Sequence, residues 1–244
     1  MSLKFEDEYA HALDNLASAL KRSYEQIKQT STFSSEFDYS QAIANRLRAF
    51  YCSQLEVKKF LNKEVAQAGS DFFVETVLFF LKLFNDLENL GLKIASERPL
   101  QKKRNTIRPD ISIWRGDELL AIIECKTQLG WHRQNWSEHF QDREKKLKDV
   151  FPKTEIFLVV MTSCNWGGFG SDPRVGKQLF CLFNDKCYIN NFIEIDTPID
   201  TPIEQLFEQI TIFLTSRCLY TLMNEMSKVR IDIYISLLDY LIGE

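Results

Sequence analysis

The sequence predicts a mixed α/β fold, and three observations lead to this class. A strongly apolar stretch of helical length occupies residues 70–90. Three short strand-like segments follow it, and two of them are joined by a turn signal. A helical segment then leads to the continuous apolar run Glu155–Met161, which is typical of a strand covered on both faces. The expected core order is therefore helix, strand, strand, strand, helix, strand (αβββαβ).

Two helices are predicted ahead of this core. In residues 4–29, apolar side chains recur at steps of three and four and form one stripe: Tyr9, Leu13, Leu16, Leu20, Tyr24 and Ile27. This stripe either packs on the rest of the protein or makes a helix-to-helix contact in a homodimer. A polar connection over residues 30–40 leads to a second helix over residues 41–52.

The buried core helix is expected to begin at Gly69-Ser70-Asp71, because an acid in the first turn suits the helix dipole. It runs to Leu90, with Gly91 as a left-handed cap. The other segments are expected at these positions: strands at 92–96, 107–114 and 119–126, a hairpin turn at 115–118, helices at 134–150 and 203–214, and a helical or mixed segment to Leu241.

These elements divide the 244 residues into three regions of one domain. Residues 1–66 form an N-terminal helical region packed on the core, residues 67–190 the core itself, and residues 191–244 a C-terminal helical region. The longest apolar run, Phe72–Phe84, is interrupted by two charges and is too short to span a bilayer. No membrane partner is expected.

The six cysteines are scattered and form no Cys-x-x-Cys pair, which favours reduced thiols over disulfides or zinc. The acidic N-terminus lacks the order of a signal peptide, and together these features favour the cytoplasm. The net charge of −4 excludes a uniformly basic nucleic-acid binder. It does not exclude a local basic surface, since residues 98–153 carry 13 basic and 8 acidic side chains.

Charged residues interrupt the two strands of the predicted hairpin. Side chains alternate along a strand, so Glu124 and Lys126 point to the same face, among apolar neighbours. The hairpin turn brings Asp110, at the start of one strand, towards Glu124, near the end of the next. Two converging carboxylates and a lysine suit Mg²⁺-assisted hydrolysis of a phosphodiester, with the Cys125 carbonyl as a further ligand. The alternative is a structural ion pair, either Glu124 with Lys126 or Asp110 with a nearby arginine.

The pattern Pro109-Asp110, thirteen residues and then Glu124-Cys125-Lys126 resembles the PD-(D/E)xK nuclease superfamily, which has the restriction-endonuclease-like fold. The resemblance covers roughly residues 70 to 165. It implies that Asp110 and Glu124 bind Mg²⁺, with Mn²⁺ as a substitute, and that Lys126 assists the attacking water. Glu75 matches the position of a further acid on the helix before the first core strand. The implied fold is a mixed-sheet core flanked by helices, with helical additions at both ends.

The resemblance implies a divalent-metal-dependent DNA endonuclease, with a restriction enzyme as the leading role. A repair or junction nuclease of the same family, or an inactive nuclease-like module that binds nucleic acid or protein, remains the alternative. Basic side chains close to the motif are expected to contact DNA phosphates, although a solvated loop and helix face would look the same. They are Lys102, Lys103, Arg104, Arg108, Arg133, Lys145 and Lys146.

Overall fold

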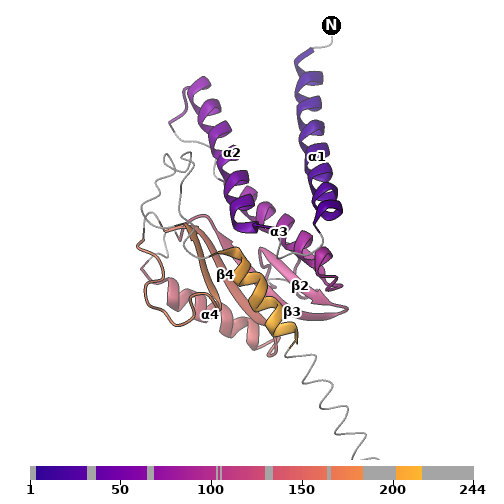
Figure 1. Cartoon of the computed structure of the whole chain (residues 1–244). Coiled ribbons are helices and arrows are strands. Elements are labelled where there is room, and N and C mark those ends of the chain that lie inside the picture. The colour runs from indigo at the N-terminus through magenta and orange to yellow at the C-terminus, as the bar shows by residue number, and fades with distance from the viewer. Residues whose placement is uncertain are drawn as a thin grey trace, which may run out of the picture.

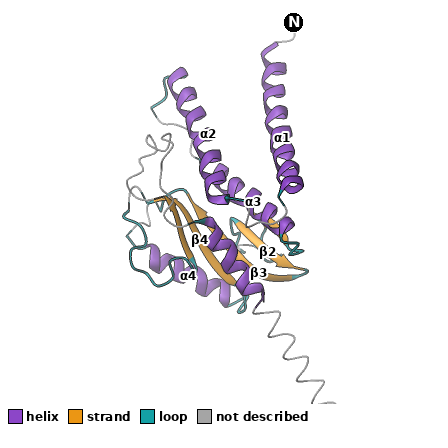
Figure 2. Cartoon of the chain, viewed as in Figure 1, coloured by secondary structure: helices purple, strands orange, loops and turns teal. Residues whose placement is uncertain are grey.

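The structure is a computed structural model that describes residues 4–31, 37–64, 69–102, 104, 106–129, 134–163, 166–183 and 202–215. Its labelled elements, shown in Figure 1, are α1 (Lys4–Thr30), α2 (Tyr39–Phe60), α3 (Ser70–Leu87), β1 (Lys93–Ser96), β2 (Ile111–Arg115), β3 (Glu118–Lys126), α4 (Trp136–Lys148), β4 (Glu155–Thr162) and β5 (Leu179–Phe183). Residues 203–215 form a further helix. The predicted α/β class is confirmed (Figure 2).

The five strands form one mixed sheet in the order β1-β2-β3-β4-β5. The first three are antiparallel neighbours, whereas β3, β4 and β5 run parallel to one another. α4 connects the parallel strands β3 and β4, as parallel pairing requires a crossover. The fifth strand was not predicted, and all of its side chains are buried.

Helices cover both faces of this sheet. On one face, apolar side chains of α2, α3 and the helix at 203–215 join those of the strands in one hydrophobic cluster. On the other face, α4 and the loop around Trp166 and Phe169 complete a second cluster. Alternation along β3 separates the two, because Ile123 and Cys125 belong to the first cluster and Ile122 to the second.

Three expected boundaries are wrong. The second helix extends to Phe60 instead of ending at 52, because the added segment consists mainly of good helix formers. α3 ends at Leu87, and the first left-handed residue after it is Asn89, with φ +50°, instead of Gly91. β2 begins at Ile111 and not at 107, where a proline without an N–H precedes the strand.

The α1 stripe divides into a packed part and an exposed part. Near its C-terminal end, Tyr24 and Ile27 pack against the core, and the Tyr24 hydroxyl and Lys28 ammonium both donate to Asp86 Oδ2 on α3, at 3.0 and 2.9 Å. Burial raises the pKa of Asp86, but these two partners outweigh it and leave the pKa below its ordinary value. Farther up the helix, Leu13 and Leu16 are 52% and 66% exposed.

Two further expectations concern the whole chain. Among the helices that the structure describes, none combines the length and the apolarity needed to cross a bilayer. Cys52, Cys125 and Cys181 are free thiols, and the other three cysteines lie outside the described residues. The segment predicted to run to Leu241 lies beyond residue 215 and is likewise outside them.

Candidate active site

The β2–β3 hairpin brings the charged motif residues together. Its strands pair Ile111 with Ile123 and Arg115 with Glu118, around a turn in which Gly116 takes φ +59°. Asp110 immediately precedes the paired part of β2, so it lies beside the end of β3 that carries Glu124 and Lys126. The local sequence thus places one acid directly ahead of β2 and the other within the adjacent strand β3.

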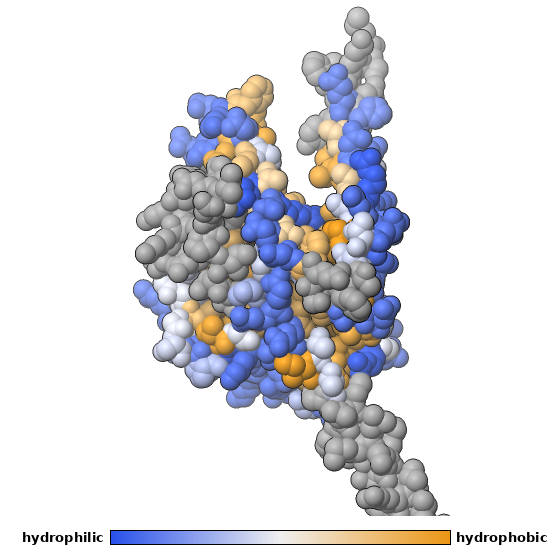
Figure 3. Space-filling model, in the orientation of Figure 1, coloured by the Kyte–Doolittle hydropathy of each residue, from blue (hydrophilic) through white to orange (hydrophobic). Residues whose placement is uncertain are grey.

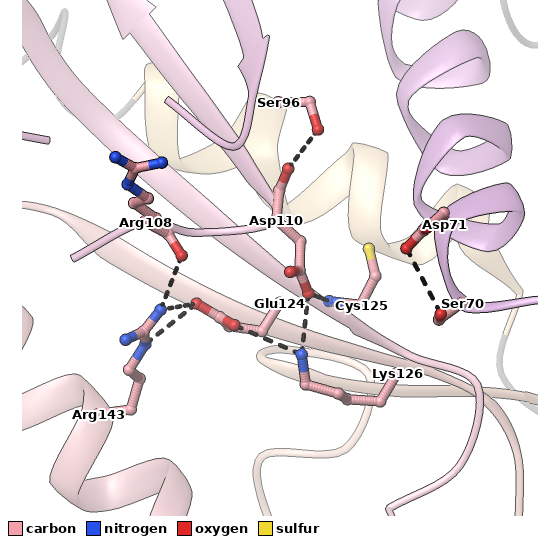
Figure 4. A network of polar contacts seen from close by, with 9 residues as sticks. All are labelled: Ser70, Asp71, Ser96, Arg108, Asp110, Glu124, Cys125, Lys126 and Arg143. Carbon is pink, nitrogen blue, oxygen red and sulfur yellow. Dashed lines mark hydrogen bonds and ion pairs between the residues drawn. The ribbon is translucent and has the colours of Figure 1, made fainter. Parts of the chain in front are cut away.

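Asp110 is held through both its side chain and its backbone. Its Oδ2 accepts hydrogen bonds from the Cys125 backbone N–H at 2.7 Å and from the Lys126 ammonium at 3.0 Å (Figure 4). Its carbonyl oxygen accepts from the Ser96 hydroxyl at 2.8 Å and from the Glu97 N–H at 3.2 Å. The end of β1 therefore holds the backbone of Asp110, and the end of β3 holds its carboxylate.

Glu124 is nearly buried and lies between two cations. Arg143 of α4 donates to Glu124 Oε1 from Nε at 3.1 Å and from Nη2 at 2.7 Å. The other oxygen, Oε2, lies 3.7 Å from Lys126 Nζ. The Glu124 side chain is 12% exposed and that of Arg143 33%. Arg143 Nη2 also donates to the Arg108 carbonyl at 3.2 Å, so it ties the segment that precedes Asp110 to Glu124.

Lys126 contacts both carboxylates, as Figure 4 shows. Burial alone would lower its pKa, but the charge and hydrogen bond of Asp110, followed by the charge of Glu124, raise the pKa above the ordinary 10.5. Lys126 is therefore an ammonium at neutral pH. Burial, followed by the charge of Asp110, raises the pKa of the adjacent Cys125 thiol well above its usual range, so this thiol stays protonated.

A cleft of about 430 Å³ opens beside this group, between the start of α3 and the ends of β1 and β3. Lys126 is the one basic residue among those that line it. Four lining residues are acidic: Asp71, Glu75, Glu97 and Asp110. Glu97 adopts φ +50°, an uncommon backbone conformation for a residue other than glycine. The cleft therefore has an excess of negative charge, although Glu124 does not line it.

Glu75 lies in the same cleft as Asp110 but has another partner. Its Oε1 accepts from Arg46 Nη2 of α2 at 2.5 Å. The Arg46 guanidinium also lies over the rings of Phe72 and Phe79, at 5.3 and 5.0 Å from their centroids. Burial lowers the pKa of Arg46, and the charge of Glu75 opposes this shift. The Glu75 carboxylate thus pairs with Arg46, and its predicted role in catalysis stays a prediction.

The oxygen atoms of Asp110 and Glu124 meet only part of what a small, oxygen-preferring cation such as Mg²⁺ needs. Asp110 and Glu124 supply carboxylates that already share one cationic neighbour, and oxygen donors of this kind suit Mg²⁺. Among the described residues, no group of three or more His, Cys, Asp or Glu side chains converges at metal-binding distance. Two carboxylates with a backbone carbonyl, as expected for Cys125, would leave the remaining positions to water and substrate.

The basic residues expected to contact DNA fall into two exposed groups. Lys102, Arg104 and Arg108 lie ahead of β2, and Lys145 and Lys146 lie in the last turn of α4. Lys103 and Arg133 lie outside the described residues. None of the described five forms an ion pair with another described side chain.

The sequence analysis did not identify Arg143 as the partner of Glu124. A signal was present, because Phe140, Arg143 and Leu147 are spaced by three and four residues, and the two apolar members are buried against the sheet. An arginine at that spacing faces the core. Asp71 and Glu97 were also missed as cleft residues, and their distance along the chain from the motif gave no signal.

Comparison with known proteins adds little to this geometry. No protein-family model and no curated protein matches the sequence. A structure of the native BbvCI A2B2 tetramer at low resolution contains a chain that aligns with 80% of this chain and 95% of its own, at 10% identity and a TM-score of 0.27. A TM-score this low supports no conclusion about the fold or the function of this chain, and no family is assigned to it.

Proposed function

We propose that this protein is a divalent-metal-dependent DNA endonuclease with a restriction-endonuclease-like core. The observation that carries the proposal is the contact of the Lys126 ammonium with two carboxylates, that of Asp110 directly ahead of β2 and that of Glu124 in β3. The elements follow one another along the chain in the order α3, β1, β2, β3, α4 and β4, and their strands lie in one mixed sheet. This order supports the proposal because it is the one expected for such a core.

The charge of the cleft supports a metal cofactor. Four acidic residues and one lysine line it, so a phosphodiester would meet net repulsion unless a cation compensates. We assign Mg²⁺ or Mn²⁺ to Asp110 and Glu124, with the Cys125 carbonyl as a further ligand. A metal ion bound there lowers the pKa of a coordinated water and neutralises charge that develops on the phosphate.

Lys126 supplies positive charge and hydrogen bonds in this proposal. As an ammonium it can orient the attacking water and stabilise the negative charge of the transition state. Asp110 fixes the ammonium by a direct 3.0 Å hydrogen bond, which limits the positions open to that water.

The substrate is proposed to be DNA, held by its phosphates. The exposed cations Lys102, Arg104, Arg108, Lys145 and Lys146, together with Lys103 and Arg133, would supply these contacts without regard to base sequence. Restriction is the leading role, and a repair or junction nuclease uses the same chemistry.

A module that binds without cutting is the second candidate, and one observation favours it. Arg143 and Lys126 already neutralise the carboxylates of Glu124 and Asp110, so the cluster is satisfied as an ion-pair network without any metal. Networks of this kind also occur for structural reasons.

The deciding experiment incubates the protein with supercoiled plasmid, duplex and single-stranded DNA, in Mg²⁺, in Mn²⁺ or with chelator. We expect cutting only with metal, and its loss in Lys126→Ala and Asp110→Asn. Asp117→Asn is the matched control, because Asp117 is exposed in the turn at the other end of the same hairpin. Metal-dependent cutting that persists in both site variants would refute the assignment, and DNA binding without cutting would support the second candidate.

A further inference from the structure

Large apolar side chains gather at the projecting ends of α1 and α2. Among the described residues, seven large apolar side chains are strongly exposed, and five of them lie here: Leu13, Leu16, Val57, Phe60 and Leu61. Phe60 is 87% exposed. Figure 3 shows the apolar part of α1 on the side that faces α2, with open space between the two projecting ends. Exposed apolar surface concentrated in one place marks an interaction site.

The exposed part of the α1 stripe continues a packed one. Tyr24 and Ile27 bury the C-terminal part of the same stripe against the core, whereas Leu13 and Leu16 project beyond it. Alanines at positions 10, 12, 17 and 19 flank the exposed leucines on both sides, and small flanking residues let another helix approach closely. This part of α1 is therefore shaped to receive a helix.

We propose that a second copy of this chain occupies this surface, with its α1 antiparallel to the first. The charges of α1 favour this occupant, because the acidic residues 6–8 (Glu-Asp-Glu) precede the leucines, whereas Lys21 and Arg22 follow them. An antiparallel pair places the acidic part of each helix beside the basic part of the other. The contact is the same on both copies, as a two-fold dimer requires.

The helix period sets the register of the pair. With Leu13 of one copy opposite Leu16 of the other, the exposed leucines of the two helices meet at the centre of the contact. A stable interface needs at least about 1,000 Å² of buried surface. The α2 tips, with Val57, Phe60 and Leu61, are the neighbouring apolar surface that can add to the α1 contact. The proposal is independent of nuclease activity.

Sedimentation of the full chain over a range of concentrations tests the proposal. We expect a dimer for the wild type and a monomer for Leu13→Lys/Leu16→Lys, a variant that places good helix formers at exposed positions. Ser18→Lys is the matched control, because Ser18 lies on the opposite face of α1 and should leave the dimer intact. Circular dichroism checks that each variant is folded.

A wild-type monomer at every concentration would overturn the proposal and leave another partner as the occupant. A leucine variant that remains dimeric would also overturn it, because the contact would then lie on another surface.

Discussion

Replacing Arg143 with methionine removes the guanidinium that holds Glu124 and keeps a side chain of similar length. Two hydrogen bonds to a carboxylate that is 12% exposed are lost, together with one to the Arg108 carbonyl. A charge-assisted hydrogen bond contributes about 1.5 to 3 kcal/mol, and breaking a fully buried pair costs about 3 to 5 kcal/mol. Arg143 is one-third exposed and Lys126 remains beside Glu124, so water and the ammonium recover part of the loss.

We therefore expect the free energy of unfolding to fall by about 2 kcal/mol. With a urea slope of about 3 kcal/mol per molar, the unfolding midpoint should fall by roughly 0.7 M. Lys146→Met is the matched control, because Lys146 is exposed on the same helix and should change stability by less than about 0.5 kcal/mol.

A double-mutant cycle with Glu124→Gln isolates the pair. We expect a coupling energy of at least about 1 kcal/mol, since each single change leaves a polar group without its partner. A coupling energy near zero would refute the reasoning, because Arg143 would then stabilise the fold without acting through Glu124.

Three other predictions concern surrounding elements. The stabilising effect of Asp86 relative to Asp86→Asn should be complete above pH 3.8 and disappear as the pH falls through its lowered pKa, as measured by urea unfolding at several pH values. Gly69→Ala should lower the free energy of unfolding by about 1 to 3 kcal/mol, because the new Cβ would overlap the Tyr51 hydroxyl. A thermal melt measures this loss of stability, and an unchanged melting temperature would contradict the prediction. Lys145→Glu/Lys146→Glu should weaken DNA binding and flatten its logarithmic salt dependence by roughly 0.9 per lost phosphate contact; an unchanged slope in a binding titration would exclude both lysines from the interface.

The hairpin could be predicted closely because its signals are local. The apolar run of β3 is bounded by a turn with Gly116 and by the charged end at Lys126, so its limits were expected within one residue. The convergence of Asp110 with Glu124 followed from strand alternation and the turn alone. The α4 crossover and β4 were also expected, since a helical period and a continuous apolar run are strong signals.

Features that depend on tertiary contacts could not be predicted in the same way. β5 is a five-residue apolar segment after an irregular loop, and its identity as a strand depends on its pairing with β4. The partners of Glu75 and Glu124 are Arg46 and Arg143, which come from helices far along the chain. Sequence spacing identifies the charged side chains of the motif, but only packing determines which cation reaches which carboxylate.

The turn of the β2–β3 hairpin offers a place to attach the protein to something else. Residues 115–118 are all exposed, and they lie at the end of the hairpin opposite Asp110 and Lys126. A short peptide tag inserted between Gly116 and Asp117 would extend into solvent without entering the cleft. A tether at this point would hold single molecules on a surface with the candidate active site directed away from the support.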